Sequence, residues 1–190
     1  KQLQRIEIDP SVKELIEETC RSLQKIREEK VYGLIRKLAT DDEEVRTGTV
    51  EELIRLGEAS VTPLVKILGA NNPNIVLAAL EVLATMGNKN SIEGIIPLLK
   101  NPDEQIKVAA IETLGRFKDE TIISHIVTSQ EDESEMVRMA VINSLNLFTG
   151  EEIVSPLLNA LFDESNAVRN KAALILDGLD MQEVASAMVT

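Results

Sequence analysis

The chain has 190 residues, of which 44% are hydrophobic and only 2% aromatic. This length suffices for one domain with its own core, while a net charge of −12 disfavours DNA, RNA and acidic membrane surfaces as partners, because these require clustered Lys and Arg. The single cysteine, Cys20, cannot form an internal disulfide, so we expect a reducing compartment and a cytoplasmic protein. No apolar run reaches the roughly 18 residues that a membrane span needs.

The first predicted element is a degenerate capping helix at residues 11–30. Its apolar residues Leu15, Cys20, Leu23 and Ile26 have the spacing of one helical face. Cys20 is therefore expected to be a small buried hydrophobe in this stripe rather than a reactive nucleophile. Polar residues cover much of the remaining surface, as in an end unit with solvent on one side.

Five repeats follow this helix, at about residues 31–57, 61–87, 92–118, 123–149 and 154–179, and a partial sixth repeat covers residues 181–190. Each repeat is expected to hold a short first helix and a longer second helix that begins near an apolar anchor. The anchors, spaced 30 or 31 residues apart, are Val45, Ile75, Ile106, Val137 and Val168. Apart from Thr49, the residues 0, 4, 5, 8 and 11 positions after the anchors are apolar, and these offsets form one broad stripe of a helix. Three residues before the anchors stand the favoured N-cap residues Asp42, Asn72, Asp103, Ser134 and Ser165.

The third repeat is the clearest copy of a known pattern. Leu99, Asn101, Pro102 and Asp103 form its turn, and residues 106–114 complete it with an apolar–basic pair, two alanines and a leucine. Over residues 31–179 the chain resembles the short HEAT-like repeats seen around phycocyanobilin lyase subunits. The resemblance implies an all-α fold, a right-handed α-solenoid of stacked antiparallel helix pairs in one domain, with the second helices lining the concave side. Stacking also explains how pairs that cannot bury their apolar stripes alone form one core.

The candidate binding groove lies 6 and 10 positions after each anchor, on the side of the second helices away from the buried arc. The groove residues are Glu51, Arg55, Glu81, Thr85, Glu112, Arg116, Asn143, Leu147 and Leu174. The N-terminal half of this set is charged, and the C-terminal half is neutral and apolar. Glu51 with Arg55, and Glu112 with Arg116, also have the spacing of pairs that merely support an exposed helix.

One apolar row leaves two interpretations open. It lies two positions after the anchors and consists of Leu77, Val108 and Met139. An exposed row of this kind marks a protein contact, whereas stacking against neighbouring helices would bury it. The pattern favours neither interpretation.

The inventory of reactive side chains predicts no enzyme and no cofactor or metal site. His125 is the only histidine, and the acidic runs at residues 41–44 and 131–135 stand at helix starts, where negative charge complements the helix dipole. A basic series, Arg46, Lys107, Arg138 and Arg169, is the nearest approach to a phosphate-binding stripe. We interpret it as structural, pairing with turn acids such as Asp132 and Asp163.

These patterns predict a non-catalytic interaction scaffold that binds a protein segment with basic side chains in a concave, partly acidic groove. The alternative is a regulatory or lyase-type accessory subunit that acts with another chain, in a tetrapyrrole or other enzyme complex, and only the family resemblance supports it. Nucleic-acid binding ranks last, and the oligomeric state is left open.

Overall fold

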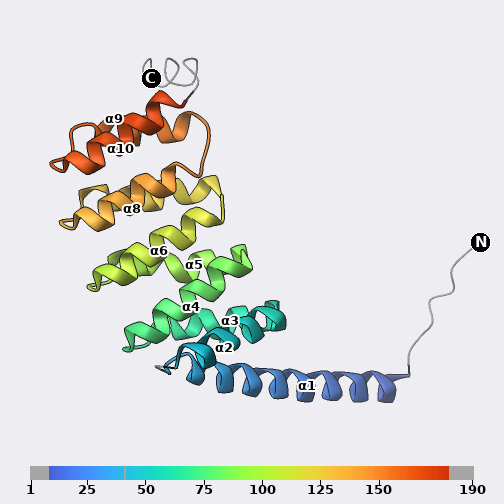
Figure 1. The fold of residues 1–190 in the computed structure, drawn as a ribbon. Coiled ribbons are helices and arrows are strands. Elements are labelled where there is room, and N and C mark those ends of the chain that lie inside the picture. The colour runs from blue at the N-terminus through green and yellow to red at the C-terminus, as the bar shows by residue number, and fades with distance from the viewer. Residues whose placement is uncertain (1–8, 41, 180–190) are drawn as a thin grey trace, which may run out of the picture.

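The computed structural model describes residues 9–40 and 42–179, and every regular element in these ranges is a helix. Figure 1 shows the helices stacked in successive layers, with α1 and α2 at one end and α9 and α10 at the other. The α-helices are α1 (Pro10–Lys37), α2 (Glu43–Leu56), α3 (Glu58–Ile67), α4 (Pro73–Met86), α5 (Ile92–Ile95), α6 (Glu104–Arg116), α7 (Ile123–Val127), α8 (Glu135–Leu145), α9 (Val154–Ala160) and α10 (Asn166–Asp177). Short 3₁₀-helices adjoin the first helices of the later layers: η1 (Lys89–Ser91), η2 (Ile96–Lys100), η3 (Glu120–Ile122), η4 (Thr128–Glu131) and η5 (Glu151–Ile153).

The second helices of the repeats are α2, α4, α6, α8 and α10, and each begins at its predicted N-cap. In every case the cap side chain accepts a hydrogen bond from a backbone N–H of the first turn, which confirms the five predicted caps Asp42, Asn72, Asp103, Ser134 and Ser165. The first helices from α5 onward are shorter and partly 3₁₀. Pro97 stands at the start of η2, where its missing N–H removes an α-helical hydrogen bond.

The core runs along the stack between the two layers of helices. Each second helix packs against the next, from α2 through α10, and the first helices α1 and α3 pack against each other as well. Eight positions after the anchors, four leucines are fully buried: Leu53, Leu83, Leu114 and Leu145.

Two aromatic residues share a core position, eleven after the anchors. Phe117 and Phe148 are both buried there, as the periodic pattern predicts. The anchor Val45 departs from the pattern because it is exposed. It belongs to α2, which packs on α1 and α4 and has no second helix before it in the described stack.

The N-terminal helix differs from the prediction. α1 is continuous, so residues 11–30 do not form a separate capping helix, and only its C-terminal part contributes Val31, Leu34 and Ile35 to the core. The remainder of α1 projects beyond the stack (Figure 1) and is exposed throughout. Cys20 is therefore exposed, not buried. The predicted stripe has helical spacing, and Cys20 and Leu23 line a hollow together with α3, but the stripe remains exposed.

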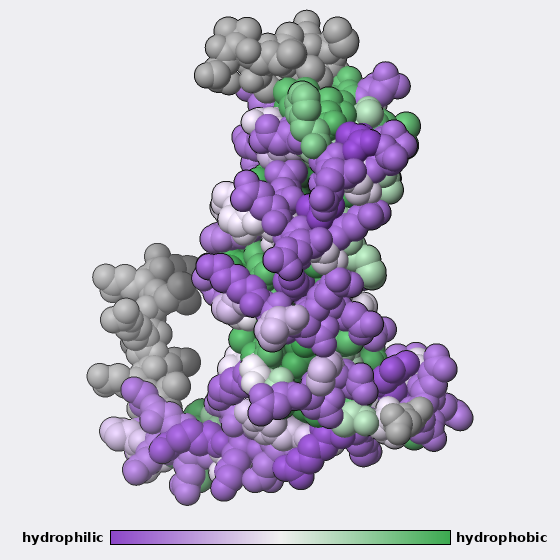
Figure 2. Space-filling model, turned by 90° about the vertical axis from the view of Figure 1, so that its left-hand side faces the viewer, coloured by the Kyte–Doolittle hydropathy of each residue, from purple (hydrophilic) through white to green (hydrophobic). Residues whose placement is uncertain are grey.

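The surface seen from the left-hand side of Figure 1 is mostly hydrophilic, and hydrophobic residues show between successive layers of the stack (Figure 2). Among the described residues, no helix combines the length and the apolar character that crossing a membrane requires. The partial sixth repeat predicted at residues 181–190 lies outside the described ranges.

Candidate functional site

Eight of the nine predicted groove residues lie on one exposed side of the second helices, and Leu147 follows the end of α8. We define the ladder face as this side of α2, α4, α6, α8 and α10. All nine of its predicted residues are exposed: Glu51, Arg55, Glu81, Thr85, Glu112, Arg116, Asn143, Leu147 and Leu174. The helical period therefore predicted correctly that these side chains are exposed, while their role in binding remains a prediction.

The acidic members of the ladder face are not neutralised by their neighbours. Within the described ranges, no ion pair joins Glu51 to Arg55 or Glu112 to Arg116, although both pairs are four residues apart, and no ion pair involves Glu81. Thr85 donates its hydroxyl hydrogen to the backbone carbonyl of Glu81, 2.9 Å away, so it does not occupy the carboxylate. Three carboxylates in successive repeats thus remain accessible.

The apolar row beside the ladder is half-buried. Leu77, Val108 and Met139 are partly exposed and pack against the core. The row is therefore neither fully exposed nor fully buried by the neighbouring helices. Val108 and Met139 also line a cavity of about 260 Å³ between α6 and α8, together with Glu112 and Asn143 of the ladder.

Sequence reasoning missed three further residues of this cavity, Glu135, Met136 and Ala140, all on α8. Glu135 and Met136 line it from the first turn of α8, and the Met136 side chain is 58% exposed. The signal was present in the sequence, since Met136 and Met139 are three residues apart and hence share a helix face.

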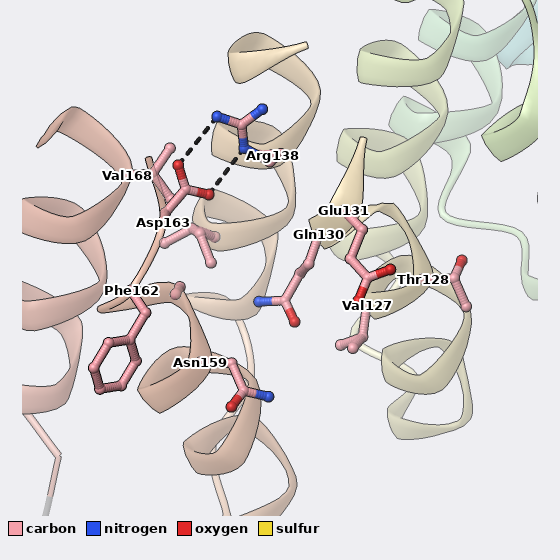
Figure 3. Close-up of a pocket in the computed structure, with 11 residues that line it drawn as sticks. Val127, Thr128, Gln130, Glu131, Arg138, Asn159, Phe162, Asp163 and Val168 are labelled. Atoms are coloured by element: carbon pink, nitrogen blue, oxygen red, sulfur yellow. Dashed lines mark hydrogen bonds and ion pairs between the residues drawn. The ribbon is translucent and has the colours of Figure 1, made fainter. Parts of the chain in front are cut away.

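The basic series lies in the first turns of the second helices, and two of its members join neighbouring repeats. Lys107 forms an ion pair with Asp132 of the following repeat, and Arg138 forms a two-pronged pair with Asp163, Nε to Oδ2 at 2.9 Å and Nη2 to Oδ1 at 3.1 Å (Figure 3). Pairing with the turn acids is thus found, but it crosses from one repeat to the next. The side chain of Arg138 is only 7% exposed, which makes this pair part of the core.

Arg138 also serves its own turn. Its Nη1 donates to the carbonyl oxygens of Asp132 at 2.9 Å and Glu133 at 3.1 Å, and Arg169 donates in the same way to Asp163 and Glu164 one repeat later. These side chains therefore satisfy backbone carbonyls at the turn as well as carboxylates. Lys107 and Arg138 are committed to these contacts and are poorly placed to neutralise phosphates.

The pairing shifts the pKa values of the turn acids and of Arg138. Burial raises the pKa of Asp132 and of Asp163, but hydrogen bonds from Lys107 and Arg138, together with backbone N–H groups, outweigh it, and both pKa values lie below the ordinary 3.8. The hydrogen bonds with Asp163 raise the pKa of Arg138 in turn. Both carboxylates are therefore ionised at neutral pH.

A second cavity, of about 590 Å³, lies between the turns of the fourth and fifth repeats (Figure 3). Gln130 lines it where most repeats have a leucine, and donates to the carbonyl oxygen of Pro156 at 3.0 Å. Phe162 lines it too and is 89% exposed. The cavity opens at the turns, so none of the nine ladder residues belongs to it.

Catalytic and metal-binding groups do not gather in the described part of the chain. His125 is exposed on α7, and Cys20 lies far from it along the stack, on α1. Over these same ranges there is no cluster of three or more His, Cys, Asp or Glu side chains suited to a metal ion.

Known proteins share the fold described above. Residues 61–146 match the family model for HEAT repeats, and no curated protein matches the sequence. In the complex of CpcE and CpcF of phycocyanin lyase from a Nostoc species, one chain is 18% identical over 77% of this chain and 97% of its own length, with a TM-score of 0.65. A designed armadillo repeat protein in complex with the peptide (KR)4 is 18% identical, covering 82% and 86%, with a TM-score of 0.51.

An enzyme is also among the similar structures. Human deoxyhypusine hydroxylase is 18% identical over 86% of this chain and 67% of its own length, with a TM-score of 0.52. At this identity the likeness concerns the fold alone. Residues 61–146 are therefore similar to HEAT repeats, and the described residues have the fold of a HEAT-like α-solenoid.

Proposed function

We propose that the chain is a non-catalytic protein-interaction scaffold whose ladder face binds an extended protein segment with basic side chains. The observation that carries the proposal is the row of accessible carboxylates Glu51, Glu81 and Glu112, which take part in no ion pair among the described residues. The proposed compartment is the cytoplasm, because the sequence has a single cysteine.

The spacing of the carboxylates suits an extended segment. Packed helices lie ~8–10 Å apart and an extended chain advances ~3.3 Å per residue, so such a segment would meet a new carboxylate about every third residue. The net charge of −12 would also speed the approach of a basic segment. A fold of similar shape, the designed armadillo repeat protein, was solved with the basic peptide (KR)4, which supports the choice of partner chemistry.

The test measures binding of fluorescein-labelled (KR)4 by anisotropy. The ladder variant carries Glu81→Lys and Glu112→Lys, and the matched control carries Glu93→Lys and Glu120→Lys, two exposed carboxylates outside the ladder. A surface ion pair contributes up to about 1 kcal/mol, and reversal replaces attraction with similar repulsion, so the ladder variant should lose ~2–4 kcal/mol of binding free energy. This loss is more than tenfold in Kd. Equal losses in both variants would reduce the interaction to non-specific charge attraction and refute the proposal.

A second candidate function rests on the likeness to the CpcE–CpcF complex. Here the chain would be an accessory subunit that acts with another chain on a tetrapyrrole protein. Incubating the chain with a bilin and its acceptor protein, with and without a candidate partner chain, would reveal a covalent adduct by its absorbance on a denaturing gel. A lack of adduct in every combination removes this candidate. Nucleic-acid binding ranks last, and its mark would be salt-dependent retention on a DNA column.

A further inference from the structure

The ladder face contains one place where apolar side chains are accessible from a hollow. The cavity of about 260 Å³ between α6 and α8 is lined by Val108, Met136, Met139 and Ala140. Val108 and Met139 are half-buried, and Met136 is largely exposed at the edge. This volume falls below the ~300–1,000 Å³ of typical small-molecule pockets, so it suits a single side chain. Unbranched methionine side chains adapt readily to the shape of an apolar group that enters.

Carboxylates flank the same hollow. Glu112 lines it from α6 and Glu135 from α8, and both are exposed. Neither takes part in an ion pair among the described residues. The entrance therefore carries negative charge next to an apolar floor, which complements an aliphatic side chain with Lys or Arg beside it.

The corresponding place in the first repeat has a different chemistry. There a hollow is lined by the residues at the same five positions relative to the anchor, on α2: Glu43, Glu44, Thr47, Gly48 and Glu51. Glu44 corresponds to Met136, and Thr47 corresponds to Met139. An aliphatic side chain consequently finds apolar contacts at α8 and not at α2. The hollows on the ladder face are therefore polar at α2 and partly apolar between α6 and α8.

We infer that the hollow between α6 and α8 binds one aliphatic side chain of the partner segment, which fixes the register of that segment on the ladder face. Glu112 and Glu135 then contact basic side chains that adjoin the aliphatic one. The inference rests on the proposed function and adds to it a specificity-determining subsite. The partner chemistry is a Leu-like residue within a basic stretch.

The first experiment compares two labelled peptides, KRKRLKRKR and KRKRSKRKR, by anisotropy with the unmodified chain. The Leu peptide should bind about tenfold more tightly, because burial of its side chain removes apolar surface from water. Equal affinities would overturn the subsite while leaving the proposed function intact. If neither peptide binds, the proposed function and the subsite fail together.

The second experiment locates the preference. A variant with Met136→Glu and Met139→Thr carries the residues that α2 has at these positions, and a control with Phe162→Ser removes an exposed apolar side chain at the turns. The first variant should bind both peptides with equal affinity, whereas the control should retain the tenfold preference. Thermal unfolding followed by circular dichroism checks that each variant folds. A preference that persists in the first variant would show that leucine binds elsewhere and overturn the inference.

Discussion

The buried ion pair between the fourth and fifth repeats gives a prediction of stability. Asp163→Ala removes a carboxylate that accepts two hydrogen bonds from Arg138 and one from the backbone N–H of Ser165. Removing one partner of a buried pair costs about 3–5 kcal/mol, because the other charge stays buried. Arg138 keeps two backbone carbonyls and an ion pair with exposed Glu164 at 2.9 Å. We therefore expect a loss near the lower limit, about 3 kcal/mol.

Two further variants separate the contribution of the carboxylate charge from that of burial. Asp163→Asn keeps an oxygen that can accept from Ser165 but loses the charge, and should cost about 1–2 kcal/mol. Glu52→Ala breaks the ion pair with Lys30, whose side chains are 37% and 54% exposed, and should cost at most about 1 kcal/mol. Urea unfolding followed by circular dichroism measures all three variants. If Asp163→Ala lost no more free energy of unfolding than Glu52→Ala, burial would not govern the strength of these pairs, and the reasoning would be wrong.

Three other predictions concern α1, the turns and the first helices. Leu23→Gln on the exposed part of α1 should change the free energy of unfolding by less than about 0.5 kcal/mol, whereas Leu34→Ala in its buried part should cost about 2–5 kcal/mol, both by urea unfolding. Folding lowers the pKa of Asp163 below 3.8, so the stability that this carboxylate contributes is complete above about pH 4 and is lost as the pH falls through the folded-state pKa. Asp163→Asn should therefore flatten the fall in melting temperature below about pH 4. Gly94→Ala should cost about 1–3 kcal/mol in urea unfolding, because the added methyl group would overlap the side chain of Val65.

The features predicted well from the sequence depend on short stretches of chain. An N-cap such as Asp103 needs only its own side chain and the backbone N–H groups of residues 105 and 106. The exposure of Glu112 likewise follows from its angle around α6 relative to the buried Ile106 and Leu114. Both depend on the helical period alone, which five similar repeats make easy to recognise.

Features that depend on neighbouring layers could not be predicted in the same way. Leu23 lies on a stripe with the same spacing as the buried stripes of the later helices, yet it is 54% exposed, because α3 only borders it across a hollow. Similarly, nothing in the local sequence indicates that Arg138 pairs across to Asp163 of the next repeat instead of staying within its own turn. The helical period determines which residues share a face, whereas the packing of neighbouring repeats determines which residues that face contacts.

The two sets of acidic residues illustrate how one period can serve structure and binding together. The turn acids Asp132 and Asp163 come within reach of the basic residue one layer earlier, so their charge is neutralised inside the stack. Glu81 and Glu112 lie in the second and third repeats, on a different side of the stack, where the successive second helices present no basic partner within ion-pairing distance among the described residues. A change at one set therefore perturbs mainly stability, and a change at the other should perturb mainly binding. Because these positions are separate, the ladder face can vary from acidic to apolar along the stack without weakening the ion pairs that join successive repeats.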